Sequence, residues 1–498
     1  MKILFTVTFL FVFVESVSSQ QFLWADSYDI SNCNEVAALA VDADSNVYIT
    51  GIHNAPVTLP FKGDAYLLKT SFNGEVLRTD SLLGELLIGD MATVGTDVLI
   101  VGQSYGDFEY RDEFYGSGQY FMFMLMLDAD GNRKWYFSDE SKSGTYANIS
   151  VGNTSDIAVH IRSQSNLADW ILIMDNDGNI LKSRVISPSF TLVSDIAFYD
   201  NKLYFNGGFN GPGSVTVDTI LIQLPPTQNA SITMGFDEDL IAQWLFTDET
   251  FSNITGRIVA NDSGLFVYEQ VVEGGFTPKN TLKKFSFGGQ LIDEAQISFF
   301  SNTSSIRADM VSTPSMIGLF PRNSFNNQSH KVMLFNHNLG IETEKVINGP
   351  SSPYPGQIAA LGDKIFVSHI HSGQLNFDNE LILPYSGAGQ KPYIAGLDDP
   401  TVTGITQKLL TETDIFIYPN PAADWVSIKL ANSNYYSGRF EIYNIHGLTI
   451  ISGKLHSKEQ RVDLNGLAAG IYSCNILLRN TTTGEERAFA QKLMVVRN

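Results

Sequence analysis

Short apolar runs separated by polar turns recur along most of the chain. One phrase is a strand-like run, a short polar turn and a second run, as in residues 37–51 and 195–208. A second phrase, in which two runs flank a two-residue turn, interleaves with the first, as in residues 65–80 and 123–137. Its Asn-Gly and Asp-Gly turns suit the positive φ angles of tight β-hairpins. Each period therefore predicts four short antiparallel strands.

The first phrase occurs seven times between residues 37 and 369. Its equivalent positions are Tyr48, Leu99, Ala158, Tyr204, Phe266, Ile317 and Phe366, spaced 46 to 62 residues apart. A sheet of four short strands cannot bury both faces alone, and radial stacking against neighbouring sheets solves this problem. The repeat thus predicts an all-β, seven-bladed β-propeller over residues 20–405. Weak copies at 148–161 and 307–320 leave six or eight blades open.

The two ends of the repeat array complement each other. The seventh unit shows three clear strands and a weak fourth, whereas residues 22–26, before the first unit, have the pattern of an isolated strand. Pairing of an N-terminal strand with the last sheet would remove two exposed sheet edges. We therefore expect residues 22–26 to complete the seventh sheet.

One hairpin ending resembles a known repeat type. Asp130-Gly131-Asn132-Arg133-Lys134-Trp135 carries the D-G-N-x-x-W pattern that closes hairpins in the loosely defined propeller repeats of secreted bacterial proteins. The other copies carry the pattern in part, and the resemblance covers about residues 20–405. It implies a propeller fold and an exported protein.

The N-terminus has the pattern of a secretory signal peptide. Lys2 precedes an apolar stretch at residues 3–14, and Val17-Ser18-Ser19 supplies the small residues of a cleavage site. We assign residues 1–19 to this signal. An apolar stretch of this length is too short for a bilayer, which needs about 20 residues, and no later run is long enough. The sequence therefore predicts export and no membrane span.

Charge separates the body of the chain from its tail. The 498 residues include 53 acidic and 32 basic side chains, so the net charge of −21 disfavours nucleic acid as a partner. Residues 415–498 contain nine basic and six acidic side chains, a net charge of +3, and are the only basic segment. We expect a second domain over 415–498, joined to the first by a linker at 406–414.

The tail alternates apolar and polar residues in short runs, which predicts a small antiparallel β-sandwich. Four phrases appear in order: Tyr418-Pro419-Asn420-Pro421, Phe440 to Gly447, Leu467 to Gly470-Ile471-Tyr472, and Gln491-Lys492-Leu493-Met494-Val495. This series of motifs closely resembles the type A C-terminal sorting domain of the type IX secretion system of Bacteroidetes. The resemblance implies passage through the periplasm, the type IX machinery as a partner, and a secreted or outer cell-surface location. The alternative is an adhesion-type sandwich without a sorting role.

Three acidic turns, at residues 42–46, 128–132 and 175–179, have the carboxylate density of calcium loops. An EF-hand loop needs glycine at its sixth position and glutamate at its twelfth. Here glycine is fourth or absent, and position twelve is His53, Asp139 or Ile186. We therefore interpret the segments as hairpin turns, and we expect no cofactor beyond incidental weak calcium binding.

Two histidines occupy equivalent repeat positions, since His53 and His371 each lie five residues after the marker residue of their copies. If sheets one and seven are neighbours, His53, His371 and His369 could approach one another and hold a metal or transfer protons. The simpler interpretation is polar residues at strand ends. No nucleophile elbow, phosphate-binding loop or HExxH motif occurs, so no catalytic, cofactor or metal residue is assigned.

Long, variable connections between hairpins, such as residues 103–115 and 209–231, would all emerge on one face of up-and-down sheets. That face would be rich in loops, acidic residues and aromatic residues. We expect a non-catalytic module that binds an extracellular carbohydrate or protein. The alternative is a propeller enzyme acting on polysaccharide or peptide. An enzyme should gather acids and histidines in its central funnel, whereas a binding module should carry aromatic residues on its rim.

Overall fold

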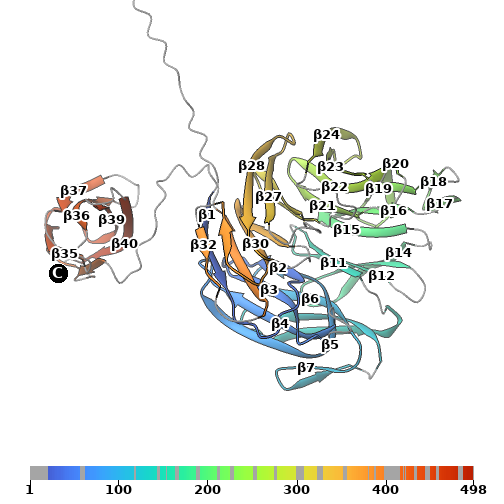
Figure 1. The fold of residues 1–498 in the computed structure, drawn as a ribbon, viewed down its shortest axis with the longest axis horizontal. Helices are drawn as coiled ribbons and strands as arrows, with labels where there is room; N and C mark the ends of the chain where they lie inside the picture. Colours follow the sequence, from blue (N-terminus) through green and yellow to red (C-terminus); the bar gives the residue numbers. More distant parts are fainter. Residues whose placement is uncertain are drawn as a thin grey trace, which may run out of the picture. The chain divides into compact units, whose positions relative to one another are not determined.

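The computed structural model divides the chain into two compact units, Met1–Pro400 and Thr401–Asn498 (Figure 1). It describes residues 21–55, 62–116, 119–142, 146–152, 154–162, 168–186, 191–209, 213–224, 229–250, 255–273, 277–298, 308–321, 329–351, 356–378, 381–385, 389–397, 415–418, 420, 422–430, 435–443, 449–455, 459–480 and 486–496. The expected signal peptide and linker lie outside these residues. Both units are all-β, and in the described ranges no helix could cross a membrane.

The first unit is built from four-stranded antiparallel meanders, numbered here as sheets 1 to 7. Sheet 1 contains β2 (Ala38–Val41), β3 (Val47–His53), β4 (Gly63–Thr70) and the first part of β5 (Val76–Val94). Sheet 2 contains the last part of β5, then β6 (Asp97–Ser104), β9 (Phe121–Leu127) and β10 (Arg133–Asp139). Sheet 3 contains β11 (Tyr146–Val151), β12 (Ile157–Arg162), β13 (Asp169–Met174) and β14 (Ile180–Ile186), and a 3-10 turn, η1 (Glu140–Lys142), precedes it.

The remaining sheets follow the same plan. Sheet 4 contains β15 (Thr191–Tyr199), β16 (Lys202–Phe209), β19 (Asn229–Phe236) and β20 (Ala242–Thr250). Sheet 5 contains β21 (Thr255–Asn261), β22 (Gly264–Glu273), β23 (Thr277–Phe285) and β24 (Leu291–Ile297). Sheet 6 contains β25 (Ala308–Ser312), β26 (Met316–Pro321), β27 (Ser329–Asn336) and β28 (Ile341–Asn348). Sheet 7 contains β29 (Gln357–Leu361), β30 (Lys364–His371), β33 (Lys391–Leu397) and β1 (Phe22–Ser27).

The N-terminal strand completes the last sheet, as the sequence predicts. β1 pairs antiparallel with β33, with Phe22 opposite Leu397 and Ser27 opposite Tyr393. In Figure 1 the blue β1 accordingly lies beside the orange strands of sheet 7. Phe22 is buried in a cluster that also contains residues of sheets 6 and 7.

Successive sheets pack face to face through shared hydrophobic clusters. Sheets 1 and 2 share one cluster, and the same holds for each following pair of sheets. Sheet 7 and sheet 1 also share a cluster, in which Phe366 of β30 packs with Ile49 of β3. The first strands of the sheets contact one another in the same order, and β29 contacts β2.

One strand departs from the simple repeat. β5 runs without interruption for 19 residues and pairs with β4 through its first part and with β6 through its second. Leu86 is the residue at which the two ladders meet, because it pairs with both Gly63 and Ser104. Sheets 1 and 2 are therefore continuous, in a sheet of nine strands that also includes a side hairpin.

Several of the long connections fold as hairpins between the second and third strands of their sheets. They are β7 (Phe108–Tyr110) with β8 (Glu113–Tyr115), β17 (Gly213–Val217) with β18 (Ile220–Leu224), and β31 (Leu375–Phe377) with β32 (Leu381–Leu383). The first pairs with β5 and the third with β28, so each attaches to the outer strand of the preceding sheet.

The second unit consists of two antiparallel sheets that share one hydrophobic core. One contains β34 (Ile415–Tyr418), β35 (Trp425–Leu430) and β38 (Glu459–Asp463). The other contains β37 (Thr449–Leu455), β36 (Tyr435–Tyr443), β39 (Gly470–Asn480) and β40 (Glu486–Val495). Ile428 of the first sheet and Ile442 and Leu493 of the second are completely buried in the same cluster.

Candidate functional site

A cavity of about 480 Å³ lies among the first strands of all seven sheets. Its lining includes Leu39 of β2 and residues of β5, β11, β15, β21, β25 and β29. The polar side chains among them include Asp90, Asn148, Asp195, Arg257, Asp309 and Gln357. We refer to these six residues as the cavity ring.

The repeat explains why these side chains meet. Asp195 lies five residues before Asp200, which begins the turn after its strand. Arg257 lies five residues before Asp262, which begins the corresponding turn of the next sheet. The pairing register agrees, since Asp90, Asn148 and Asp195 lie opposite Val101, His160 and Asn206 in their second strands. Each sheet therefore brings the same position of its first strand to the cavity. The polar residues are dispersed in sequence and adjacent in space.

The carboxylates of the cavity ring bind the backbone of the next sheet. Asp90 Oδ2 accepts a hydrogen bond from Ile149 N at 2.8 Å, and its Oδ1 accepts one from Met91 N at 2.8 Å. Asp195 Oδ2 accepts from Ile258 N at 3.1 Å. Asp309 Oδ2 accepts from Ile358 N at 2.9 Å. These contacts fasten one inner strand to another.

Arg257 is the cation of the cavity ring and lies between two of its carboxylates. Its Nη1 is 3.9 Å from Asp195 Oδ1, and its Nε is 3.5 Å from Asp309 Oδ1. Nε also donates to the carbonyl oxygen of Ala308 at 3.2 Å. The Arg257 side chain is 31% exposed and lines the cavity. Among the described residues, neither of its Nη groups has a hydrogen-bond partner.

The surrounding protein makes the carboxyl groups weak acids. Burial raises the pKa of Asp90 to about 7, although the N–H groups of Ile149 and Met91 act in the opposite direction. Burial likewise raises the pKa of Asp195 to about 6 against the effect of Arg257. The pKa of Asp309 is also raised by burial. The cavity thus combines one cation with carboxyl groups that keep their protons to a higher pH than a free aspartate does.

Asn148 connects the cavity to a buried hydrogen-bonded pair, His160 and Asp169, inside sheet 3. Its Nδ2 donates to His160 Nδ1 at 3.1 Å and to the carbonyl oxygen of Ser194 at 3.4 Å. His160 Nε2 lies 2.9 Å from Asp169 Oδ1, and both of these side chains are completely buried. These hydrogen bonds link Asp169, through His160, to the side-chain amide of Asn148, which lines the cavity.

Two of the three histidines singled out from the sequence share a neighbour, because the rings of His369 and His371 both lie beside the ring of Tyr393. His53 is buried and contacts Asn54 and the ring of Tyr66. His369 packs against His330, with ring centroids 4.6 Å apart. His371 Nε2 lies 2.8 Å from Ser27 Oγ. In the described part of the chain, no group of three or more histidine, cysteine or acidic side chains is placed to hold a metal, so a joint role for these histidines remains a hypothesis.

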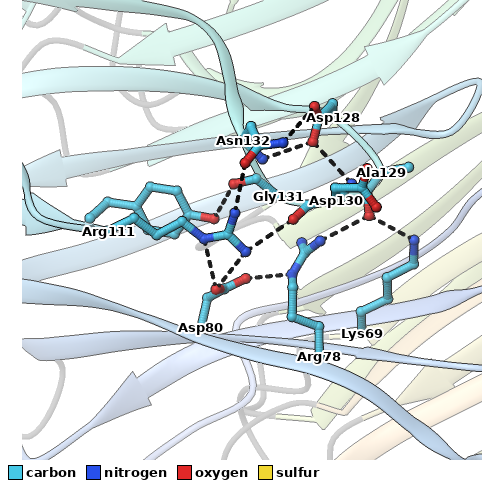
Figure 2. Close-up of polar contacts among 10 residues, drawn as sticks. Lys69, Arg78, Asp80, Arg111, Asp128, Ala129, Asp130, Gly131 and Asn132 are labelled. Carbon is cyan, nitrogen blue, oxygen red and sulfur yellow. Dashed lines mark hydrogen bonds and ion pairs between the residues drawn. The ribbon is translucent and has the colours of Figure 1, made fainter.

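The acidic turns are held together by their own side chains. Asp128 Oδ1 accepts from Asp130 N at 3.0 Å and from Asn132 N at 2.8 Å, and Asp175 makes the same contacts in its turn. Figure 2 shows that sheet 1 also holds the turn of sheet 2, because Lys69 and Arg78 both donate to the carbonyl oxygen of Ala129 at 2.9 Å. This geometry fits hairpin turns that also fasten one sheet to the next.

Arg111 strengthens this contact from the side hairpin. Its Nη2 donates to the carbonyl oxygen of Asp130 at 3.0 Å, and its Nε donates to Asp80 Oδ1 at 3.1 Å (Figure 2). Asp80 in turn pairs with Arg78 at 2.5 Å. The Asp80 carboxylate thus pairs with both Arg78 and Arg111. Its role is to stabilise the contact between the two sheets.

Aromatic side chains gather at the side hairpin of sheet 2. Phe114 of β8 is 77% exposed, and Tyr120, just before β9, is 57% exposed. The Tyr120 ring meets that of Tyr105 edge-on, with centroids 4.7 Å apart, and Lys62 Nζ lies 3.1 Å from the centroid of Tyr105. The structure thus shows acids in the cavity and exposed aromatic residues at this side hairpin.

The first, third and fourth of the tail segments that resemble a sorting domain contact one another around β40. Asn420 Oδ1 accepts from Met494 N at 2.9 Å. Gly470 pairs with Val495, and Tyr472 pairs with Leu493. Tyr418 donates to Glu459 Oε1 at 2.7 Å. Lys492 takes part in the β39–β40 ladder opposite Ser473, whereas Pro419, Pro421 and Gly447 lie outside the described residues.

Comparison with known families identifies the tail. Residues 416–488 match the model of the secretion system C-terminal sorting domain. This sorting domain supports secretion through the type IX system, and it implies interaction with that system's machinery and export to the exterior or the cell surface. No curated protein matches the chain.

Solved structures resemble the chain only distantly. The extracellular domain of a putative one-component system from B. thetaiotaomicron is 9% identical, covers 93% of this chain and 87% of its own, and has a TM-score of 0.22. A neuraminidase-like protein from a virus of the little yellow-shouldered bat is 15% identical, over 69% of this chain and 93% of its own, with a TM-score of 0.30. A europium-containing methanol dehydrogenase is 9% identical, over 76% and 94%, with a TM-score of 0.37. These values do not establish a shared fold.

Proposed function

We propose that the chain is an exported protein in which a seven-bladed β-propeller, residues 20–405, serves as a non-catalytic binding module. Residues 1–19 are its signal peptide, residues 406–414 a linker and residues 415–498 the sorting domain. The protein reaches the exterior or the outer cell surface through the periplasm, and its ligand is an extracellular carbohydrate or protein.

Three features of the first unit support the propeller. The sheets follow one another with shared hydrophobic clusters, and sheet 7 shares a cluster with sheet 1. The first strands contact one another in series, and β29 contacts β2. The N-terminal strand β1 completes sheet 7. A radial arrangement around the cavity accounts for all three.

The bonding of the cavity carboxylates carries the non-catalytic assignment. Asp90, Asp195 and Asp309 each accept a hydrogen bond from a backbone N–H of the next sheet. A glycosidase needs one carboxyl group free to donate a proton and another free to attack or to activate water. Carboxylates that hold inner strands together serve stability first, so binding is the better-supported role for the cavity.

An extracellular hydrolase is the second candidate. The raised pKa of Asp90, about 7, and that of Asp195, about 6, favour it, because a general acid works best with a pKa near the working pH. Incubation of the full chain with extracellular polysaccharides and peptides, with measurement of new reducing ends and new amines, separates the two. The proposal expects no release above that of Asp195→Asn. Release that this substitution abolishes would establish the hydrolase.

Export is tested in a host that possesses a type IX system. The full chain and a variant lacking residues 415–498 are each expressed, and the two ends of the protein found in medium, surface and periplasmic fractions are sequenced. The proposal expects the full chain outside the cell and the truncated chain in the periplasm. The substitution Ile450→Ser, at an exposed position of the sorting domain, serves as the control and should leave export intact. Unchanged export of the truncated chain would contradict the proposal.

A further inference from the structure

We infer that the central cavity binds a neutral, hydroxyl-rich molecule of the size of a simple sugar, held between Arg257 as donor and Asn148 as an oriented acceptor. This inference rests on the proposed binding function and names the chemical class of its ligand. The cavity volume, about 480 Å³, falls in the range of roughly 300–1,000 Å³ that is typical of small-molecule sites.

The donor side of the site is the end of Arg257. Its Nε is engaged by the carbonyl oxygen of Ala308, which fixes the plane of the guanidinium. The two Nη groups have no hydrogen-bond partner in the described part of the chain, and the side chain lines the cavity. A guanidinium presents its N–H groups in a rigid fork, which can donate to two neighbouring oxygens of one ligand.

The acceptor side is Asn148, whose orientation is set from behind. Both contacts of Nδ2, to His160 Nδ1 and to the carbonyl oxygen of Ser194, point away from the cavity. Asp169 accepts from His160 Nε2, so His160 Nδ1 is left as an acceptor for the Asn148 amide. The Asn148 Oδ1 oxygen is then the polar atom left for a ligand. We regard His160 and Asp169 as positioning residues.

Charge selects a neutral ligand over an ionic one. Arg257 lies between Asp195 and Asp309, which offset its charge and make an anionic ligand unfavourable. A cationic ligand would need free carboxylate oxygens, but Asp90, Asp195 and Asp309 each already bind a backbone N–H group, and the last two flank Arg257. Hydroxyl groups both donate and accept, so they suit a site that contains an arginine, an amide and carboxyl groups.

The walls supply apolar surface beside these polar groups. Val259 and Val311, two positions along their strands from Arg257 and Asp309, are half-buried residues of the cavity lining, whose exposed surface is otherwise mostly polar. A sugar ring carries C–H surface as well as many hydroxyl groups, so a mainly polar site with a few apolar side chains matches it. Inorganic ions offer no such surface and would leave these walls unused.

The test compares neutral, anionic and cationic sugars of similar size. Saturation-transfer NMR with the full chain measures binding of methyl glucoside, glucuronate and glucosamine, and of the same series with galactose stereochemistry. The inference expects saturation by a neutral sugar and binding of its charged analogues that is weaker by roughly tenfold or more. Preferred binding of glucuronate or glucosamine, or no binding of any probe, would overturn it.

Variants then test the two sides of the site. Arg257→Lys keeps the charge and removes the fork, and it should weaken sugar binding roughly tenfold to a hundredfold. Arg184→Lys, in an ion pair with Asp218 away from the cavity, is the matched control and should bind as the unmodified chain does. Equal binding by the Arg257→Lys variant would contradict the inference even if every other variant failed to fold.

A double-mutant cycle tests the positioning role. Asp169→Asn should weaken sugar binding in the unmodified chain and have no further effect when Asn148→Ala is already present, because Asp169 acts only through Asn148. Additive losses would show that Asp169 merely supports the fold. If the Arg257→Lys variant loses sugar binding but still adheres to host polysaccharide, the binding function stands and lies at the rim. If the unmodified chain binds neither sugars nor polysaccharide, the proposed function fails as well.

Discussion

Trp135 of sheet 2 lies directly over Gly178, the turn glycine of sheet 3. A Cβ atom on Gly178 would lie 2.7 Å from Trp135 Cδ2, and Trp135 Nε1 donates to the neighbouring carbonyl oxygen of Asn176 at 2.9 Å. Trp244 has the same relation to Gly289 of the following sheet. The D-G-N-x-x-W pattern is therefore a contact between sheets, in which the tryptophan of one hairpin covers the glycine of the next.

Substitution of the covered glycine should destabilise the first unit. Gly178 has φ of +84°, so alanine there is strained, and its methyl group also collides with the Trp135 ring. We expect Gly178→Ala to lower the free energy of unfolding by about 2–4 kcal/mol. Gly95→Ala is the control, since Gly95 has φ of +64° with open space around it, and should cost only about 1–2 kcal/mol. Urea unfolding followed by tryptophan fluorescence measures both, and equal losses would refute the contact.

The N-terminal strand should contribute strongly to stability. Phe22 is 6% exposed and packs in the core shared by sheets 6 and 7, whereas its neighbour Leu23 is 46% exposed. Phe22→Ala should lower the free energy of unfolding by about 3–5 kcal/mol. Leu23→Ala should change it by no more than about 0.5 kcal/mol. Thermal unfolding of the two variants checks this expectation, which similar losses for both would rule out.

A buried ion pair within sheet 5 is also bonded to side chains of sheet 4. Lys283 Nζ lies 2.7 Å from Glu269 Oε2, both side chains are almost completely buried, and Asn206 donates to Glu269 Oε1 at 2.9 Å. Glu269→Gln leaves Lys283 Nζ paired with Asp248 at 2.8 Å but removes its buried carboxylate partner, and it should cost about 2–3 kcal/mol. Glu344→Gln breaks the more exposed pair with Lys331 and should cost at most about 1 kcal/mol. Denaturant titration measures the free energy of unfolding of both variants. An equally small loss for Glu269→Gln would contradict this expectation.

The stability of the first unit should fall as the pH rises toward the pKa of Asp90 in the folded chain. Burial raises this pKa to about 7 in the folded chain, whereas an unfolded aspartate titrates near pH 3.9. The folded chain thus binds the extra proton between these values, and that contribution is complete below about pH 4 and lost by about pH 7 to 8. Asp90→Asn resembles the protonated form, so its stability relative to the unmodified chain should improve from pH 5 to pH 8.

Asp128 supplies the control for this pH series. The hydrogen bonds from Asn132 lower its pKa below 3.8 although burial acts to raise it, so Asp128 stays ionised above pH 5. The stability difference between Asp128→Asn and the unmodified chain should therefore be constant from pH 5 to pH 8. Unfolding free energies measured across this range test both statements. A constant difference for Asp90→Asn as well would mean that Asp90 is an ordinary surface acid.

The hairpins and the tail could be predicted from the sequence because they depend on interactions between residues close together in the chain. An Asp-Gly-Asn turn specifies its own hydrogen bonds, as Asp128 shows, so the position of each such hairpin could be predicted. The pairing of residues 22–26 with the last sheet is confirmed by β1 and β33. The continuous course of β5 was not predicted, because the pairing of Leu86 on both sides depends on two strands that are distant in sequence.

The cavity ring was missed because its members lie on different repeats. Its six members belong to four residue types (Asp, Asn, Arg and Gln), and none stands in a known motif. The available signal was their common position five residues before a turn, which marks one face of one strand in every repeat. The histidines drew attention instead because His53 and His371 share a residue type at equivalent positions. Equivalent positions predict equivalent places in the sheets, but they do not predict mutual contact.

The pairing of Phe22 with Leu397 places the two ends of the first unit a single strand spacing apart. A short peptide could therefore join these ends, and new ends could be opened at a turn such as Gly95 without removing a strand from any sheet. Such a circular permutant would join the segments that precede and follow the first unit to a different turn of that unit. During synthesis, in contrast, sheet 7 stays incomplete until nearly 400 residues have been made, so the first strand must wait for its partner while the other sheets form.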